Sequence, residues 1–240
     1  MNNSITSKRH SSARGMLASA VMFVALCASS GTSAVEPAQI VPTSETAYGE
    51  TYAEHSASYW QWYLSEPLVG HPGIDSPEFN VKSGQRGKVW FLSGLLGTGT
   101  INVTVPAGKA LFIGLLNAEA SSLEEPPFYG ETEEEQRAAA NAIVDHVVSL
   151  AATVDGQPVA DIGQYRVTSP QFSFVAPTPW IFGSVGGEGT AVADGYYLLL
   201  RPMSKGTHTV NFSGSFLFTL EQDGFDQEIP ADVTINITVK

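Results

Sequence analysis

The strongest constraint on the fold is a series of short runs of branched and aromatic residues, which fill much of the chain after residue 88. Residues of these types favour β-strands, and turns that contain glycine or proline separate the runs. The last run alternates apolar and polar residues, as a strand with one buried face does. The main runs that we expect to form strands are KVWFLSGLL (88–96), TINVTV (100–105), ALFIGLLNA (110–118), GYYLLLRPM (195–203), THTVNFSGSFLFTLE (207–221) and ADVTINITVK (231–240).

The turns between these runs indicate how the strands are joined. Pro106-Ala107-Gly108 suits a type I turn, which predicts a hairpin of strands 100–105 and 110–118. Asp155-Gly156 marks another tight turn, and the acidic segment 223–228 lacks the spacing of a calcium loop and is interpreted as a solvated hairpin tip. We therefore predict a mainly β protein, an antiparallel β-sandwich of jelly-roll or immunoglobulin-like kind with two accessory helices.

The two helices are expected near residues 50–65 and 132–150. The second begins with a capping box of Thr132 and Glu135 and carries three glutamates in its first turn. The first contains the aromatic stretch YWQWY, in which Trp60 and Trp62 lie about 160° apart around the helix axis. Two rings so placed cannot stack on one sugar. We expect this helix to be buried against the sheets, with at most one tryptophan near the surface, rather than to form a stacking platform.

The N-terminus has the order of features of a secretory signal peptide. Three basic residues precede an apolar run at 16–28, and small residues follow at 32–34. We expect cleavage near Ala34, a polar lead-in at 35–48, and a single β-rich domain at 49–240 in the periplasm or outside the cell. The alternative is a lipoprotein signal that ends at Cys27, although Leu26 occupies the position where a small residue is required.

Composition limits the partners and the chemistry. The chain has a net charge of −12, and loss of residues 1–34 leaves nine basic against 24 acidic residues, a net charge of −15. Such acidity opposes binding to nucleic acid or to an anionic membrane. Cys27 is the only cysteine, so no disulfide is expected. No segment after residue 34 is apolar for long enough to cross a membrane.

Motifs for catalysis and for cofactors are missing from the sequence. There is no G-x-S-x-G motif, no phosphate-binding loop and no closely spaced histidine pair for zinc. We therefore expect no metal and no cofactor. Residues at strand ends and in a proline- and glycine-rich loop remain as candidates for binding a carbohydrate, a small ligand or another exported protein. These candidate ligand-binding residues are Asn117, Glu119, Arg166, Trp180 and Phe182.

Several segments, taken in order, resemble a family of exported bacterial and archaeal proteins of uncharacterised function. The segments are GQRGKVWFLSGLLG, VPAGKALFIGLLNAE, VDGQPV, YRVTSPQFSF and DGYYLLLRPMSKGTHTVNFSGS, and the likeness covers roughly residues 50–240. Members of this family often have cysteines before the first two segments, and this chain has none there. The resemblance implies secretion and a single β-rich domain, and it implies no activity.

Three functions fit these observations. The first is an exported, non-catalytic binding or envelope-associated module. The second is a periplasmic or secreted hydrolase with a carboxylate pair that includes Glu119, for which Asp194 is a possible partner across a sheet. The third is a structural domain that assembles with itself or with a larger complex.

Overall fold

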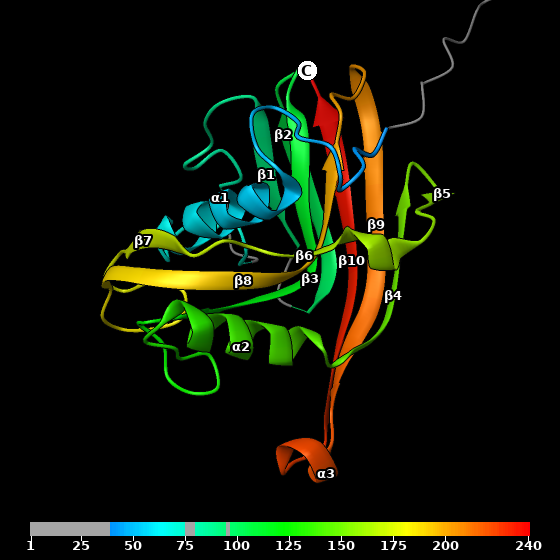
Figure 1. Ribbon diagram of the computed structural model, residues 1–240. Coiled ribbons are helices and arrows are strands. Elements are labelled where there is room, and N and C mark those ends of the chain that lie inside the picture. Colours follow the sequence, from blue (N-terminus) through cyan, green and yellow to red (C-terminus); the bar gives the residue numbers. More distant parts are fainter. Residues whose placement is uncertain (1–38, 75–79, 95–96) are drawn as a thin grey trace, which may run out of the picture. The chain divides into compact units, whose positions relative to one another are not determined.

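The computed structural model describes residues 39–74, 80–94 and 97–240, and the structural statements below refer to these residues. The predicted signal peptide therefore lies outside the described residues. Figure 1 shows two sheets with helices packed around one of them. The elements are α1 (Tyr52–Ser65), β1 (Val89–Ser93), β2 (Thr98–Val105), β3 (Ala110–Ser121), α2 (Glu133–Val144), β4 (Val147–Val154), β5 (Gln157–Pro158), η1 (Ile162–Tyr165), β6 (Arg166–Thr168), β7 (Phe172–Ala176), β8 (Gly187–Leu200), β9 (Gly206–Phe218), α3 (Leu220–Asp223) and β10 (Gln227–Val239).

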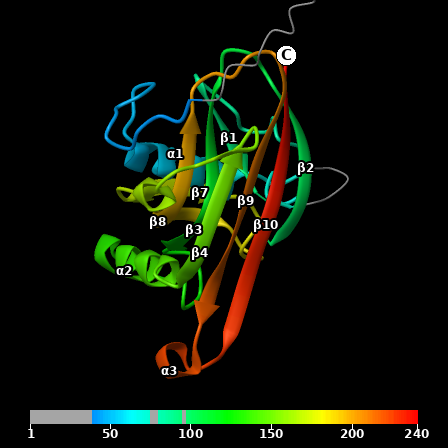
Figure 2. The ribbon, with the colours of Figure 1, turned by 90° about the vertical axis from the view of Figure 1, so that its right-hand side faces the viewer.

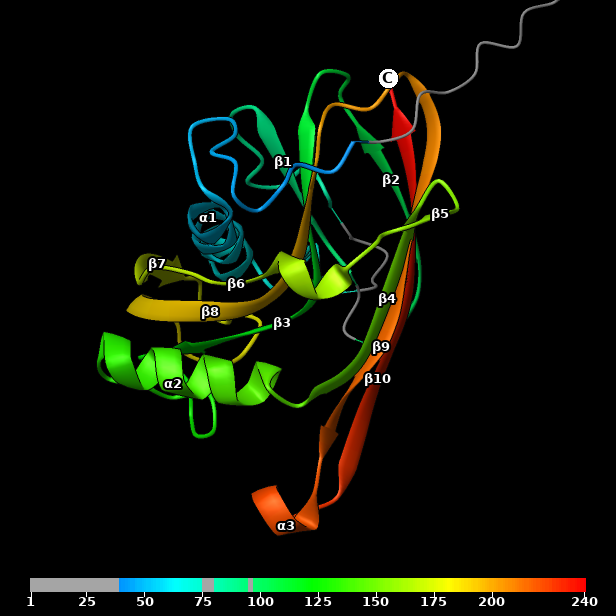
Figure 3. The ribbon, with the colours of Figure 1, turned by 45° about the vertical axis from the view of Figure 1, so that its right-hand side comes forward.

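The two sheets contain five strands each. The first sheet has the order β1-β3-β8-β6, with β7 also paired to β8, and the second has the order β2-β10-β9-β4-β5. Helix α1 contacts β7 and β8, whereas α2 contacts β3 and β8. In Figure 3, α1 and α2 lie on opposite sides of β8. The prediction of a mainly β protein with two sheets and accessory helices is therefore confirmed.

Two details of the predicted topology are wrong, because β1 pairs with β3, and β2 with β10, in parallel. Strands β2 and β3 do not form a hairpin; they belong to different sheets, and Pro106-Ala107-Gly108 carries the chain from one sheet to the other. The difference in burial explains this, since β2 buries only the alternate residues Ile101, Val103 and Val105, whereas nearly all of β3 is buried. A strand that is apolar throughout belongs at the centre of a sheet that is covered on both faces.

Helix α2 ends earlier than the sequence predicts, at Val144 rather than near residue 150. The branched residues Val147 and Val148 begin β4, which pairs with β9. A further short helix, α3, was not predicted and lies at the end of the β9–β10 hairpin (Figure 2). Gly224 ends this helix with φ of 79°, a conformation that favours glycine. The prediction of a solvated hairpin tip at 223–228 is confirmed.

The aromatic helix forms much of the core, as predicted. Trp60 and Trp62 are only 6% and 7% exposed. The indole N–H of Trp60 donates to the hydroxyl of Tyr197 in β8 at 2.9 Å. The hydroxyl of Tyr52 donates to the carbonyl of Val41 at 2.8 Å and accepts from the N–H of Leu199 at 2.9 Å. Helix α1 is therefore fixed to β8 by buried polar contacts as well as by apolar packing.

The segment before α1 packs against the first sheet. The N–H of Val41 donates to the carbonyl of Leu199, and the N–H of Arg201 donates to the carbonyl of Gln39. Ala47 and Glu50 then close a tight turn in which Tyr48 has φ of 58°. Within the described ranges, no helix is both long and apolar enough to cross a membrane.

Candidate functional site

A groove of about 970 Å³ lies beside α1 and is the main candidate site. The groove is lined by one face of α1, by Tyr48 and Glu50 in the turn before it, by the segment 84–91 that leads into β1, by the neighbouring parts of β7 and β8, and by Ser122 after β3. Because α1 is anchored to β8 through its buried face, its outer face is held rigidly along the groove. The side chains from α1 and from β7 and β8 that line the groove are His55, Ser58, Gln61, Trp62, Ser65, Ser173, Phe174, Val175, Glu188 and Thr190.

Hydrogen bonds fix the walls of the groove. The side-chain amide of Gln61 donates to the carbonyl of Ser173 at 2.6 Å and so joins α1 to β7. The indole N–H of Trp62 donates to the carbonyl of Ser83 at 2.8 Å. The hydroxyl of Ser58 donates to Glu50 Oε1 at 3.0 Å. These contacts link α1 to β7, to Ser83 just before the segment 84–91 and to Glu50 in the turn before the helix, so this part of the wall is held in place.

The groove also carries basic side chains that have no carboxylate partner among the described residues. Arg86 and Lys88 line it, and no ion pair of either is found in this part of the chain. The other arginines of the described part, apart from Arg86, are all paired with acidic residues: Arg137 with Glu133, Arg166 with Asp145 and Asp194, and Arg201 with Glu45.

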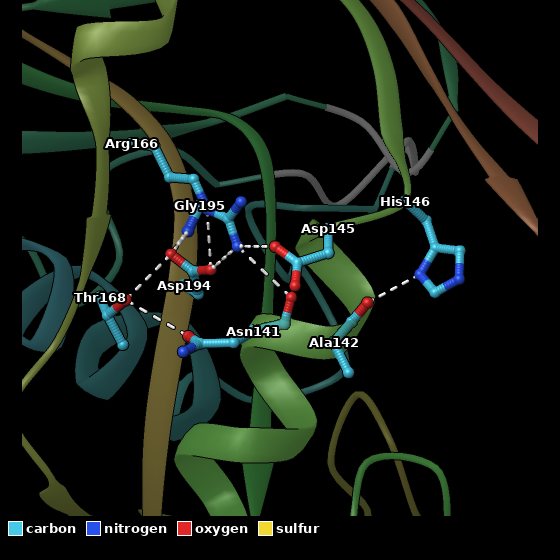
Figure 4. A network of polar contacts seen from close by, with 8 residues as sticks. All are labelled: Asn141, Ala142, Asp145, His146, Arg166, Thr168, Asp194 and Gly195. Carbon is cyan, nitrogen blue, oxygen red and sulfur yellow. Dashed lines mark hydrogen bonds and ion pairs between the residues drawn. The ribbon is translucent and has the colours of Figure 1, made fainter.

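Arg166, a predicted binding residue, lies in a network of polar contacts at the end of α2 (Figure 4). Its guanidinium donates to Asp194 Oδ2 at 3.0 Å and lies 2.7 Å from Asp145 Oδ1. Asp194 is fully buried, and its other oxygen accepts the N–H of Gly195 at 2.9 Å. The network connects β6, β8 and the end of α2, so it holds these elements together. The charge of Arg166 is already balanced by Asp145 and Asp194.

Glu119, a second predicted residue, is 2% exposed, and neither of its carboxylate oxygens has a hydrogen-bond partner. Burial, together with the neighbouring Glu124 carboxylate, raises the pKa of Glu119 well above its ordinary value. Asp194 pairs across the strands with Ala118 rather than with Glu119. Because successive residues of a strand point to opposite faces, Glu119 and Asp194 lie on opposite faces of the sheet. The carboxylate that neighbours Glu119 is thus that of Glu124, not that of Asp194, and Glu119 itself is shielded from solvent.

The other three predicted residues lie elsewhere. Asn117 pairs with Gly195 next to a bulge in β3, and its side-chain amide donates to the carbonyl of Leu115 at 3.3 Å. Trp180 is only 2% exposed, whereas Phe182 is 38% exposed, and their ring centres lie 5.7 Å apart. None of the five predicted residues lines the groove described above. Sequence reasoning missed the groove, although the basic pair in QRGK was a signal that could have drawn attention to it.

Ser204, His208 and Asp155 lie in the spatial order of a serine hydrolase triad. His208 Nδ1 is 2.8 Å from Asp155 Oδ2, and His208 Nε2 is 3.5 Å from the hydroxyl of Ser204. However, Nε2 lies only 2.9 Å from the main-chain carbonyl oxygen of Ser204. A nitrogen that donates to this carbonyl cannot accept the hydroxyl proton, so the arrangement ties two turns together instead of activating a nucleophile.

The described residues contain no cluster of three histidine, cysteine, aspartate or glutamate side chains that could hold a metal ion. Their geometry defines a two-sheet β protein with a partly polar groove. No protein-family model matches the sequence, and neither does any curated protein.

Three solved structures show a distant likeness to this chain. A cysteine protease inhibitor, EhICP2, from Entamoeba histolytica shares 8% identity over 63% of this chain and 95% of its own, with a TM-score of 0.21. The structure of PbICP-C in complex with falcipain-2 shares 13% identity over 64% of this chain and 100% of its own, with a TM-score of 0.23. Amebosin shares 12% identity over 61% of this chain and 100% of its own, with a TM-score of 0.16. Likeness at this level carries no conclusion about function.

Proposed function

We propose that this protein is an exported, non-catalytic binding module whose ligand occupies the groove beside α1. The groove itself is the observation that carries the proposal. Its volume of about 970 Å³ lies at the upper end of the range for ligand pockets, roughly 300–1,000 Å³. The hydrogen bonds around α1 hold part of its wall in place, which lowers the entropy lost on binding. Export remains an expectation from the N-terminal sequence.

The lining favours an extended polar ligand, and an oligosaccharide is the class that fits it best. Hydroxyl and amide groups, from Ser58, Gln61 and Ser173 among others, lie beside the half-buried ring of Phe91 and the exposed side chain of Val175. Sugars offer both surfaces that such a lining needs, since their hydroxyls form hydrogen bonds and their C–H faces pack on aromatic rings.

The basic residues in the groove favour acidic oligosaccharides over neutral ones as ligands. Arg86 and Lys88 lie in the groove of a chain that carries a net charge of −12. Three acidic residues, Glu50, Glu66 and Glu188, also line the groove. Glu50 is already engaged by Ser58 and His55. A ligand carboxylate or sulfate would be placed beside Arg86 and Lys88, with which it can form charge-assisted hydrogen bonds.

A thermal-shift measurement tests the proposal. The probes are oligogalacturonate and a sulfated oligosaccharide, with a neutral maltooligosaccharide and a short peptide for comparison. At a hundredfold excess over its Kd, a ligand stabilises the folded state by about 2.7 kcal/mol. We expect the acidic sugars to raise the Tm by several degrees.

A groove-filling variant separates groove binding from adsorption elsewhere. Ser65 is exposed and lines the groove, whereas Ser213 is exposed on β9 outside it. We expect Ser65→Trp to abolish the shift and the matched variant Ser213→Trp to retain it. An absent shift with every probe, or an equal shift in both variants, would contradict the proposal.

A further inference from the structure

The outward face of the second sheet carries a regular array of small polar side chains. Strands β2, β10 and β9 lie side by side in register, and each contributes alternate residues to this face. One row across the three strands consists of Thr100, Thr234 and Asn211. The next two rows are Asn102, Asn236 and Thr209, and then Thr104, Thr238 and Thr207. We call these nine residues, all of them threonine or asparagine, the threonine face.

The array follows from the sequences of the three strands. The segments TINVT (100–104), TINIT (234–238) and THTVN (207–211) alternate a small polar residue with one that points into the interior. The residues between those of the threonine face, such as Ile101, Ile235 and Val210, are buried. Helices α1 and α2 contact strands of the first sheet, and in Figure 2 neither helix lies in front of β9 and β10. Every residue of the threonine face is exposed or half-buried, so the face is open to solvent.

The side chains of the threonine face hold fixed positions. The side-chain amide of Asn236 donates to Asn102 Oδ1 at 3.0 Å, and that of Asn211 donates to Thr234 Oγ1 at 2.6 Å. Threonine branches at Cβ, which restricts its χ1 angle. Outward residues recur about every 6.6–6.8 Å along a strand, and neighbouring strands lie about 4.7–4.9 Å apart. The hydroxyl, methyl and amide groups therefore repeat regularly in two directions.

The composition of the threonine face argues against the usual classes of ligand. None of its nine residues has an aromatic ring on which a sugar could stack, and none has a charge that could bind an ion. Charged residues lie at its border, among them Asp155, Asp232 and Lys240. Hot spots for protein partners are rich in tryptophan, tyrosine and arginine and poor in threonine. None of the nine residues lines the groove beside α1, where a small ligand would bind.

An ordered lattice of water matches these properties. Hydroxyl and amide groups form hydrogen bonds with water, and the methyl groups of the threonines restrict the orientation of the water molecules next to them. Because the side chains repeat in two directions, the water that they order repeats in the same directions. The surface of an ice crystal also repeats its water molecules in two directions, whereas a single dissolved ligand does not require such a repeat.

We infer that the threonine face binds ice through this layer of ordered water. The inference goes beyond the proposed function and does not depend on the groove or on any sugar. Binding requires an uninterrupted array, because a long charged side chain would keep its own hydration and hold the crystal away from the neighbouring positions.

Slow growth of ice from a dilute solution of the purified protein tests the inference. The measured quantity is the ratio of protein in the ice to protein in the remaining liquid. Thr238→Lys and Thr207→Lys place a long charged side chain within the threonine face, whereas Gln227→Lys makes the same change of charge at an exposed position of β10 outside it. We expect the wild type and Gln227→Lys to be enriched in the ice, and both threonine variants to lose this enrichment.

Circular dichroism identifies any variant that does not fold. Thr207 is exposed whereas Thr238 is half-buried, so Thr207→Lys keeps the test valid if Thr238→Lys is unfolded. Exclusion of the wild type from the ice would overturn the inference, and so would equal enrichment of all the folded proteins. Sedimentation checks a second copy of the chain as the alternative occupant. A wild-type dimer that Thr207→Lys dissociates would assign the face to self-assembly and overturn the inference, whereas a monomer enriched in ice would support it.

Discussion

Among single residues, Glu119 is a buried side chain whose chemistry departs clearly from that of the free amino acid. Its carboxyl group is buried beside Glu124, without a hydrogen-bond partner for either oxygen. The pKa of Glu119 is raised, so the folded protein holds this proton more tightly than the unfolded chain does. The stabilising effect of the held proton is therefore complete below the ordinary carboxyl range near pH 4.5 and is lost as the pH rises through the folded value.

Replacement of Glu119 by glutamine keeps the shape and removes this titration. We expect Glu119→Gln to raise the Tm at about pH 8 and to leave it nearly unchanged at about pH 5, because the neutral amide avoids an ionised carboxylate in the interior. The control is Glu125→Gln, since Glu125 is exposed. Thermal unfolding of the three proteins at both pH values checks the prediction. A Glu119→Gln protein that is less stable than the wild type at the higher pH would contradict it.

The sequence predicts Glu119 at the end of a strand, but it does not predict that its side chain is buried. The segment LLNAEA places a glutamate at the end of an apolar strand, and polar groups at strand ends often lie at an open rim. In the structure β3 continues to Ser121, so Glu119 lies inside the strand and points into the interior. The face to which a residue points depends on the strand register and on the bulge near Asn117, and neither is written in local composition.

At the scale of elements, the helix N-termini are the features most directly encoded in the sequence. The capping box predicted at Thr132 and Glu135 is confirmed, and a second one at Thr51 and Glu54 begins α1. In each box the threonine side chain accepts the N–H of the glutamate, and the glutamate side chain accepts the N–H of the threonine. Both boxes satisfy N–H groups that would otherwise lack a partner.

Removal of one cap tests this assignment. We expect Thr132→Ala to lower the free energy of unfolding by about 1 kcal/mol, the usual loss for an N-cap threonine. Thr207→Ala, at an exposed position in β9, is the matched control, for which we expect a change within about 0.5 kcal/mol. Urea denaturation measures both. Equal losses in the two variants would show that the cap contributes nothing specific.

Strand pairing was much less predictable than the capping. The runs and most of their boundaries follow from β-propensity and alternation, but the parallel pairs β1/β3 and β2/β10 join segments that no local turn connects. The turn at 106–108 has the composition of a hairpin turn, although it joins two different sheets. Which strands pair is decided by the burial of whole faces, which the turn residues do not specify.

At the scale of the whole molecule, the position of the basic residues matters more for the binding of an anionic ligand than the net charge does. The chain is strongly acidic, and within the part that the structure describes the arginines outside the groove are held by acidic neighbours. Arg86 and Lys88 are left to face the groove. Because Glu50, Glu66 and Glu188 line the same groove, Arg86 and Lys88 attract an anionic group to their own surroundings while the glutamates and the rest of the acidic chain repel it.

Removal of both charges tests this part of the proposal. We expect Arg86→Gln combined with Lys88→Gln to weaken binding of oligogalacturonate at least tenfold, since each charge-assisted hydrogen bond contributes about 1.5–3 kcal/mol. Lys205→Gln, outside the groove, should leave the Kd unchanged. Isothermal titration calorimetry at low and high salt measures the effect, and high salt should weaken the wild type more than the double variant. Equal affinities in all three proteins would contradict the assignment.

The most direct test of the groove as a ligand site is a map of backbone amide shifts during titration with oligogalacturonate. The account predicts that the perturbed amides cluster along residues 58–66, 84–91, 173–175 and 188–190, which border the groove. Perturbations centred on residues 180–182, on the hairpin tip at 220–226, or on no region at all would contradict it.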